Sequence, residues 1–417
     1  MPRIVLATFG SLGDLHPALA LALELKRRGH QAEIATSEIY RAKVSALGLG
    51  FHAIRPAIMV IEEALIRRVM DGRRGSAYLM RDLLFPAVRD MHADLRRVVA
   101  GADALVASEL VYAAPLLAET TGLRWISYSL APISLFSVFD PPLLPGPPGT
   151  AWVQSLGAPV NRLLRVVAKL ATHGWWRPLR DLRRELGLPP APSPFFEGKY
   201  SPRLDLALFS SVLQAPPRDW PASTVQCGFP FYDEEETASA LPPAAVAFLA
   251  AGPPPLLFTL GSSAVYAAGD FYAESARAAQ RLGRRALLLL GKNPPPPDLP
   301  PSILAWDYLP YARIFPHAAA IVHQGGIGTT AQALRAGRPM LVVPFAHDQF
   351  DNAARVTRLG VARSLSRHRY RAASAAHALA FLLDDPRPAL RAAALARRLT
   401  AEHGVSTACD AIERALS

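Results

Sequence analysis

The stretch from Ala319 to Ala353 constrains the fold of this chain more than any other part. An apolar run that ends at His323 predicts a buried strand, and a glycine-rich turn and a helix from about Thr329 to Gly337 follow it. A second apolar run, Met340 to Val343, then leads into a polar loop, His347-Asp348-Gln349. This order of strand, turn, helix and strand is typical of a parallel α/β sheet.

The turn and the polar loop together predict a ligand site. A glycine-rich turn that feeds a helix presents unpaired backbone N–H groups and the positive end of the helix dipole to one point. Such a point suits a phosphate or diphosphate. The polar loop follows the next strand, so it should emerge at the same carboxyl edge of the sheet, where α/β proteins bind ligands. A Gly-Gly-x-Gly turn alone is also consistent with tight strand–helix packing.

The whole segment resembles the donor-binding signature of family 1 glycosyltransferases, the UDP-glycosyltransferase superfamily. It is most similar to bacterial members that act on lipids and other hydrophobic small molecules, such as rhamnolipid-type rhamnosyltransferases and sterol glucosyltransferases. In that family the glycine turn holds the nucleotide diphosphate, and an acidic-Gln pair, here Asp348-Gln349, holds hydroxyls of the donor sugar. The resemblance covers the N-terminal loop and nearly all of the second half, and it is weak between about residues 55 and 200.

Length and composition indicate a globular, cytoplasmic protein. The chain has 417 residues, of which 51% are hydrophobic and 19% charged, so two domains are expected. Two cysteines, Cys227 and Cys409, cannot form a disulfide framework, and a reducing compartment fits them. The N-terminus enters a strand without a signal-peptide pattern, and no apolar run is long enough to predict a transmembrane helix.

The formal charge of +11 and the pI near 10.0 raise the question of an anionic partner. The arginines are scattered over the expected helices, and no basic tract with interleaved aromatics is present. Nucleic-acid binding is therefore disfavoured, and a solvated basic surface is the favoured explanation. Steering of an anionic donor, or peripheral adhesion to acidic lipid headgroups at the inner membrane surface, stays open.

The two halves of the chain show the same alternation of strands and helices. The first half opens with a strand from Arg3 to Phe9, a loop, and a helix expected from about Pro17 to Gly29. The pattern restarts after residue 250, where prolines lead into the strand and turn LLFTLGSS. Strands that alternate with helices predict parallel sheets covered on both faces.

These patterns predict two Rossmann-like domains. We assign residues 1–213 to an N-terminal, acceptor-binding domain, 214–241 to a linker, and 242–395 to a C-terminal, nucleotide-sugar-binding domain. Residues 396–417 are expected to form a helix that packs back on the N-terminal domain. The family resemblance implies the same α/β architecture, GT-B, in which the parallel sheets of two Rossmann-like domains face a central cleft.

Two other kinds of enzyme fit the sequence poorly. Gly10-x-x-Gly13 is not a G-x-G-x-x-G fingerprint, which disfavours an NAD-dependent oxidoreductase. The sequence has no D-x-D triplet and no His/Asp/Glu group with ligand spacing, so we expect no metal site and no cofactor beyond the donor substrate. The family resemblance implies metal-independent, inverting transfer by direct displacement.

The loop GSLGDLHP, residues 10–17, resembles the family loop that carries the catalytic base. Many members have His after the second glycine, whereas this chain has Asp14 there and His16 two residues later. Asp14 is the first candidate for the base, and His16 is the second because imidazoles titrate near neutral pH. Asp is also a favoured N-cap, so a structural role for Asp14 stays open. Glu109 lies near where some relatives place an acid that supports the base.

Alignment with the family also assigns the donor contacts. The diphosphate-binding His of many relatives falls on Gln324, whose amide can donate to a phosphate oxygen but cannot become cationic. Either Gln324 binds the diphosphate, or backbone N–H groups of Gly328 and Thr329 dominate, and His323 is either a ligand or a satisfied strand-end side chain. The aromatic platform for the nucleobase is Trp306 or Tyr308. The expected donor contacts are Ser262, Ser263, Trp306, Tyr308, Leu309, His323, Gln324, Gly326, Gly328, Thr329, Thr330, Gln332, Asp348 and Gln349.

The acceptor side is less defined. Residues 128–148 carry aromatics and prolines, and they indicate either an apolar acceptor pocket or ordinary core with a long loop. The resemblance implies transfer of a hexose, glucose or rhamnose, from a UDP- or dTDP-sugar to a hydroxyl of a hydrophobic small molecule. A non-catalytic sugar-nucleotide or lipid-binding protein and a nucleotide-sugar 2-epimerase are the alternatives.

Overall fold

The computed structural model describes residues 1–57, 62–144, 150–233 and 240–417. The chain forms two compact units, and it passes from one unit to the other after Glu62, Arg73, Phe231 and Glu402. The first unit contains Met1–Glu62, Arg74–Phe231 and His403–Ser417, and the second contains Glu63–Arg73 and Tyr232–Glu402. Among the described residues, no helix has the length and apolarity to cross a membrane.

The first unit is built on a parallel sheet with the strand order β3-β2-β1-β4-β5-β6-β7. The central strand β1 pairs with β2, where Val5 lies opposite Glu33, and with β4, where Val5 lies opposite Leu105. The strands are β1 Arg3–Ala7, β2 Gln31–Thr36, β3 Gly50–Ala53, β4 Ala104–Ser108, β5 Arg124–Ser129, β6 Asp205–Ala207 and β7 Thr224–Gln226.

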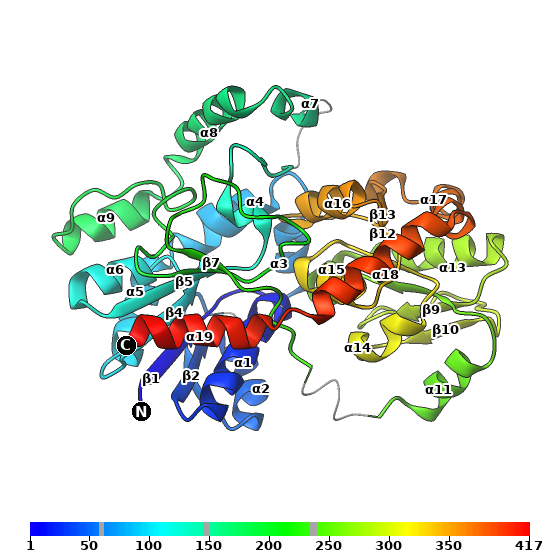
Figure 1. The fold of residues 1–417 in the computed structure, drawn as a ribbon, viewed down its shortest axis with the longest axis horizontal. Helices are drawn as coiled ribbons and strands as arrows, with labels where there is room; N and C mark the ends of the chain where they lie inside the picture. The colour runs from blue at the N-terminus through cyan, green and yellow to red at the C-terminus, as the bar shows by residue number, and fades with distance from the viewer. Residues whose placement is uncertain (58–61, 145–149, 234–239) are drawn as a thin grey trace. The chain divides into compact units, whose positions relative to one another are not determined.

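Helices cover both faces of this sheet. One face buries its apolar side chains, such as Val5 and Leu105, against α5, α6 and α9. On the other side α1 packs against β2 and against α19, which lies beside it in Figure 1. The helices are α1 Leu12–Arg27, α2 Arg41–Ala46, α4 Gly75–Ala77, α5 Val88–Val98, α6 Ala114–Thr121, α7 Thr150–Gln154, α8 Ala158–Thr172, α9 Arg177–Glu185 and α19 Gly404–Leu416.

The second unit repeats this design with the strand order β10-β9-β8-β11-β12-β13. Its strands are β8 Leu256–Thr259, β9 Ala286–Leu289, β10 Ile303–Trp306, β11 Ala320–His323, β12 Met340–Val342 and β13 Ala362–Ser364. Its helices are α3 Glu63–Val69, α11 Pro243–Ala250, α12 Gly261–Ala264, α13 Phe271–Arg281, α14 Tyr311–Ile314, α15 Ile327–Arg335, α16 Gln349–Arg358, α17 Ala372–Asp384 and α18 Pro386–Thr400.

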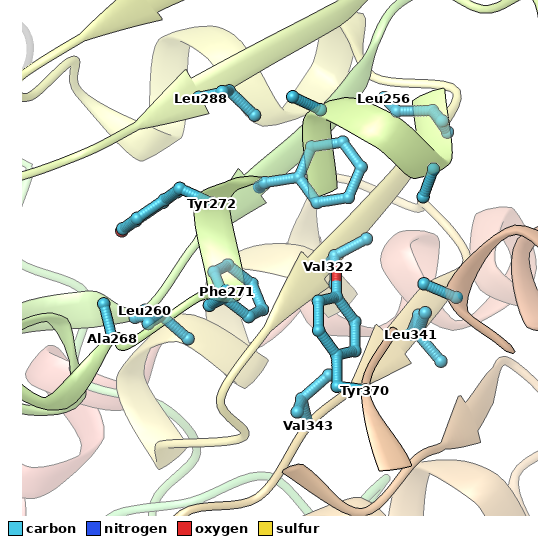
Figure 2. Packing of buried hydrophobic residues seen from close by; sticks show 14 of the residues in the cluster. Leu256, Leu260, Ala268, Phe271, Tyr272, Leu288, Val322, Leu341, Val343 and Tyr370 are labelled. Carbon is cyan, nitrogen blue, oxygen red and sulfur yellow. The ribbon is translucent and has the colours of Figure 1, made fainter. Parts of the chain in front are cut away.

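The core of the second unit lies between its sheet and the helices α13 and α17. Figure 2 shows Val322 and Leu341 of the strands beside Tyr370, and Phe271 and Leu288 belong to the same buried cluster. The rings of Phe271 and Tyr370 stack with centroids 4.9 Å apart. The buried Tyr370 hydroxyl lies 2.8 Å from Ser275 Oγ, so burying this ring leaves no unsatisfied polar group.

The structure differs from the sequence expectations at several boundaries. The first helix begins at Leu12, not near Pro17, because Ser11 is its N-cap and Pro17 lies inside it. The helix after the glycine turn begins at Ile327. The expected linker 214–241 contains β7 of the first sheet, and its residues 234–239 lie outside the described part.

Two short segments, residues 63–73 and 396–402, belong to the second unit, although the expected domain limits do not include them in it. Residues 63–73, with α3, belong to the second unit, and Met70 lies in its core. The final helix α19 belongs to the first unit, as expected, and Arg28 pairs there with Asp410 at 2.5 Å and with Glu413 at 2.7 Å. Residues 396–402 belong to the second unit and not to this final helix.

Gly404 controls how α19 docks. A Cβ at this position would lie 2.4 Å from the Phe229 carbonyl oxygen, and backbone cannot yield as a side chain can. We expect Gly404→Ala to lower the free energy of unfolding of the first unit by about 1–3 kcal/mol, measured by chemical denaturation. The control is Gly174→Ala, where a Cβ meets nothing within 4 Å. Equal denaturation midpoints for the two variants would contradict the role of Gly404.

Candidate active site

Each sheet has one place where neighbouring strands send their connections in opposite directions. In the first sheet this place lies between β1 and β4, and in the second sheet between β8 and β11. The following loops therefore diverge and leave room at the carboxyl edge, which is where open α/β sheets bind ligands. The predicted base loop follows β1 and Glu109 follows β4. Ser262 and Ser263 follow β8, and the glycine turn follows β11.

The Asp14 carboxylate is fixed by the start of α1. Its Oδ2 accepts hydrogen bonds from the Ser11 backbone N–H at 2.8 Å and from Ser11 Oγ at 3.2 Å. Gly10 has φ +137°, and a Cβ there would lie 2.2 Å from this same oxygen. Asp14 is thus the partner of the N-cap Ser11 in a capping box, and not the N-cap itself.

The surroundings of Asp14 make its carboxylate more basic than that of an ordinary aspartate. Burial raises the pKa of Asp14 to about 6, against the opposing effect of the hydrogen bonds from Ser11. The negative charge of Glu109 adds a smaller upward effect on the pKa. Asp14 is therefore mostly ionised at pH 7 and can accept a proton near neutral pH.

His16 leaves α1 in a different direction from Asp14. Residues two apart on a helix do not face each other, so the two side chains lie on different faces of α1. Both are partly buried. Both residues therefore stay separate candidates for the base. Asp14 is the one whose pKa is raised by the charge of Glu109.

Glu109 is engaged by two residues that the sequence did not reveal. The Ser134 hydroxyl donates to its Oε1, and the buried Lys199 ammonium forms an ion pair with its Oε2. Tyr200 donates to the Ser134 carbonyl oxygen at 2.7 Å and so extends the cluster. Ser134 and Lys199 lie 25 and 90 residues from Glu109, and no local pattern connects such distant positions. Glu109 acts on Asp14 through its charge.

In the second unit, the Gln324 side chain lies under two glycines. Gln324 is 5% exposed, and its Nε2 lies 3.3 Å from Thr329 Oγ1, to which it donates. A Cβ on Gly261 would lie 2.3 Å from this nitrogen, and one on Gly326 would lie 2.8 Å from it. The glycines of the loops after β8 and β11 therefore make room for one amide that packs closely against both loops.

His323 supports the same turn through a hydrogen bond to its backbone. Its Nδ1 accepts a hydrogen bond from the Gly325 N–H at 3.0 Å, and the side chain is completely buried. Burial lowers the pKa of His323 to about 3, so the ring is neutral and its proton is on Nε2. These contacts favour the strand-end reading of His323 over a direct ligand.

The first turn of α15 is open to a ligand at Gly328. Gly326 is the N-cap, and a Cβ added to Gly328 meets nothing within 4 Å. The first N–H groups of a helix have no partner inside it. Thr330 lies just beyond, and its buried Oγ1 has no hydrogen-bond partner among the described residues. This surface has the donors and the dipole that a diphosphate needs.

Asn352 joins the glycine turn to the polar loop after β12. Its Nδ2 donates to the Gly325 carbonyl oxygen at 2.9 Å and to Asp348 Oδ2 at 2.7 Å. Gln349 uses its Oε1 to accept the backbone N–H groups of Phe345 and Ala346 at 2.8 and 3.1 Å. Asn352 thus connects the acidic-Gln pair to the glycine turn. The hydrogen bonds of Gln349 within its own loop go to its Oε1 and not to its amide nitrogen.

The remaining predicted donor contacts are spread over three places. Ser262 and Ser263 are partly exposed on α12, at the carboxyl end of β8. Tyr308 is 55% exposed after β10, whereas Leu309 is 1% exposed and belongs to the interior. Trp306 ends β10 and is partly buried. Leu309 is therefore placed to support the aromatic loop and not to touch a nucleobase.

Gln332 takes part in a polar contact on α15. Its Oε1 accepts a hydrogen bond from Arg335 Nη2 at 2.7 Å, and the same guanidinium pairs with Asp233.

The described residues include no group of three or more His, Cys, Asp or Glu side chains that could hold a metal ion.

The aromatic segment 128–148 is mostly core where it is described. Residues 131–138 are buried or partly buried, and 145–149 lie outside the described residues. A hollow of about 480 Å³ lies elsewhere in the first unit, beside α6 and α9. It includes Arg124 and Trp125 at the start of β5, so it is not at the carboxyl ends that carry Asp14 and Glu109. We therefore do not interpret this hollow as an acceptor pocket.

Two family models match the chain, one in each half. Residues 4–122 match the N-terminal domain of glycosyltransferase family 28, and residues 290–409 match the C-terminal domain of erythromycin biosynthesis protein CIII-like proteins. The chain is 34% identical to O-mycaminosyltylonolide 6-deoxyallosyltransferase of Streptomyces fradiae, over 99% of this chain and 97% of the relative. It is 28% identical to 4'-demethylrebeccamycin synthase of Lentzea aerocolonigenes, over 99% of each.

Solved structures share the fold. The glycotransferase of kitacinnamycin superposes with a TM-score of 0.75 at 24% identity and full coverage of both chains. Spinosyn rhamnosyltransferase SpnG, complexed with thymidine diphosphate, superposes with a TM-score of 0.68 at 20% identity, over 99% of this chain and all of SpnG. The match along nearly the whole Streptomyces fradiae relative, on two parallel-sheet units, shows that the chain belongs to the family 1 glycosyltransferases of GT-B fold and is a nucleotide-sugar-dependent enzyme.

Proposed function

We propose that this enzyme transfers a hexose from a dTDP- or UDP-sugar to a hydroxyl of a hydrophobic small molecule, with inversion and without a metal ion. The observation that carries the proposal is the pair of loops after β11 and β12, where Asn352 joins the glycine turn to Asp348 and Gln324 lies against Gly261 of the loop after β8. Relatives named for 6-deoxyallose and rhamnose transfer, and a relative complexed with thymidine diphosphate, support a dTDP-6-deoxyhexose as the first donor to test.

The diphosphate would bind at the first turn of α15. No side chain of the described turn supplies a positive charge, because Gln324 is an amide and His323 is neutral. The charge of the leaving group would therefore be stabilised by backbone N–H groups, hydroxyls and the helix dipole. These donors are fixed before the substrate arrives, so they need no reorganisation during the reaction.

The transfer itself would be a single displacement. The acceptor oxygen attacks the anomeric carbon, its O–H proton passes to the Asp14 carboxylate, and the bond from the anomeric carbon to the diphosphate oxygen breaks. The nucleoside diphosphate leaves with that electron pair, and the new glycosidic bond has inverted configuration. The pKa of Asp14, raised to about 6 by burial, suits this proton transfer near neutral pH.

A donor-by-acceptor screen tests the function. We would incubate the enzyme with dTDP-rhamnose, dTDP-glucose or UDP-glucose and a panel of macrolide aglycones, sterols and polyphenols, and detect products by mass spectrometry. We expect donor consumption only when an acceptor is present. Consumption without an acceptor indicates an epimerase or hydrolase, and nucleotide binding without any turnover across the panel favours a non-catalytic binding protein.

Gly328→Val tests the diphosphate site. The new side chain has room in the free protein but would stand over the first turn of α15, so we expect at least a tenfold loss of affinity for dTDP and UDP by calorimetry. Gly252→Val is the control, because a Cβ there meets only Arg285, at 3.5 Å. Unchanged affinity in a folded Gly328→Val protein would place the diphosphate elsewhere.

Asp348→Ala tests the contact with the donor sugar. We expect turnover with the nucleotide-sugar to fall at least tenfold while the Kd for the free nucleoside diphosphate stays within about twofold. Asp348→Asn is the matched variant, because it keeps an oxygen that can accept from Asn352 Nδ2. If both variants lose nucleotide affinity and turnover equally, the residue supports the loop and does not contact the sugar.

Asp14→Asn tests the base. The amide keeps an oxygen for the Ser11 N–H but loses basicity, so the fold should persist while kcat falls about 10²- to 10⁴-fold. In the unchanged enzyme, kcat/KM should fall as pH drops below about 6, because protonated Asp14 cannot accept a proton. His16→Ala is the contrast and should have a small effect. Near-normal kcat in Asp14→Asn together with collapse in His16→Ala would make His16 the base.

A further inference from the structure

The helix α8, Ala158–Thr172, carries its apolar side chains on the outside. Leu163, Val166, Val167 and Leu170 follow the i, i+3, i+4, i+7 spacing of one helix face, and each is more than half exposed. We call this face the α8 stripe. Trp152 and Leu156, on the segment that leads into α8, are also more than half exposed. In Figure 1, α8 stands away from the sheet of its own unit.

Polar side chains hold α8 to the rest of its unit. Asn161 is buried and donates to the Val138 carbonyl oxygen at 3.0 Å. Arg165 and Lys169 form ion pairs with Glu197, and the distance from Arg165 Nη2 to Glu197 Oε1 is 2.7 Å. The helix is thus reversed with respect to an ordinary amphipathic surface helix, which buries its apolar side. A contiguous exposed apolar face of this kind marks a surface for a partner.

The charge around the stripe limits what that partner can be. Between Asp140 and Asp181 the sequence has no acidic residue, and it has five basic ones, which are Arg162, Arg165, Lys169, Arg177 and Arg180. Arg165 and Lys169 pair with Glu197 and Arg177 pairs with Asp181, whereas no ion pair of the described residues includes Arg162 or Arg180. Arg162 is exposed and flanks the stripe, one position before Leu163. The partner must therefore offer an apolar layer beside negative charge. A second copy of this chain would place the same cations opposite one another.

We propose that the α8 stripe, with Trp152 and Leu156, lies in the surface of a lipid bilayer that carries anionic headgroups. A basic amphipathic helix of this type lies in the plane of the interface, with its apolar face among the acyl chains and its cations at the headgroups. Trp is a side chain favoured at that boundary. The proposal does not depend on which donor or acceptor the enzyme uses, and its test measures no sugar transfer.

The test is cosedimentation of the full-length enzyme with sucrose-loaded vesicles. One set contains phosphatidylglycerol and phosphatidylcholine in equal parts, and the other contains phosphatidylcholine alone. We expect binding to the anionic vesicles and at least tenfold weaker binding to the neutral ones. An enzyme that stays in the supernatant with anionic vesicles, or that binds both sets equally, would overturn the proposal.

Two matched pairs of variants locate the surface. Leu170→Ser should reduce the partition coefficient onto anionic vesicles about tenfold or more, since one buried leucine is lost from the interface. Leu390→Ser on α18, a leucine of similar exposure, should have no effect. Arg162→Gln should weaken binding about fivefold, and Arg397→Gln, exposed on α18, should not.

Two further results would also overturn the assignment. Equal losses in Leu170→Ser and Leu390→Ser would mean that the protein adheres without a preferred face. A dimer in sedimentation velocity that Leu170→Ser converts to monomer would make a second copy of the chain the occupant of the stripe. Circular dichroism of each variant confirms that an exposed substitution has left the fold intact.

Discussion

Parallel pairing of the central strands is the constraint on which the rest of this structure depends. When β1 pairs with β4, and β8 with β11, the chain must leave each pair in opposite directions. The central strands bury mainly apolar side chains, so most of the candidate site residues lie in the loops beyond their carboxyl ends. Close approach of those loops then requires glycine, as Gly10 shows against Asp14 and Gly261 against Gln324.

The candidate sites of the two units differ in their electrostatics. In the first unit, burial and a nearby charge make one carboxylate, Asp14, more basic. In the second unit, burial keeps His323 neutral, and the diphosphate turn relies on amides, hydroxyls and backbone dipoles. Protonation near pH 6 would therefore change the charge of Asp14 in the first unit and leave His323 in the second unit unaltered.

Local sequence patterns predicted the parts of this structure that are local. Apolar runs and glycine turns predicted the central strands β1, β8, β11 and β12 and the α/β class, whereas the short strand β7 falls in the expected linker. The family resemblance drew attention to Asp14, Gln324 and Asp348. Helix starts were displaced because Ser11 and Gly326 cap earlier than the apolar periodicity suggests. Lys199 and Asn352 were missed, since their partners Glu109 and Gly325 lie 90 and 27 residues away and only the tertiary fold brings them together.

The segment Glu63–Arg73 has a consequence for recombination among relatives of this enzyme. It lies in the first half of the sequence but supplies Met70 to the core of the second unit. Its Gly72 passes so close to the loop after β12 that a Cβ would lie 2.7 Å from the Phe345 carbonyl oxygen. A chimera joined at a single point near Phe231 would therefore place a foreign segment 63–73 against its own loop after β12. An exchange of the whole first unit needs four crossover points, after Glu62, Arg73, Phe231 and Glu402, so that this segment and α19 stay with the units that they complete.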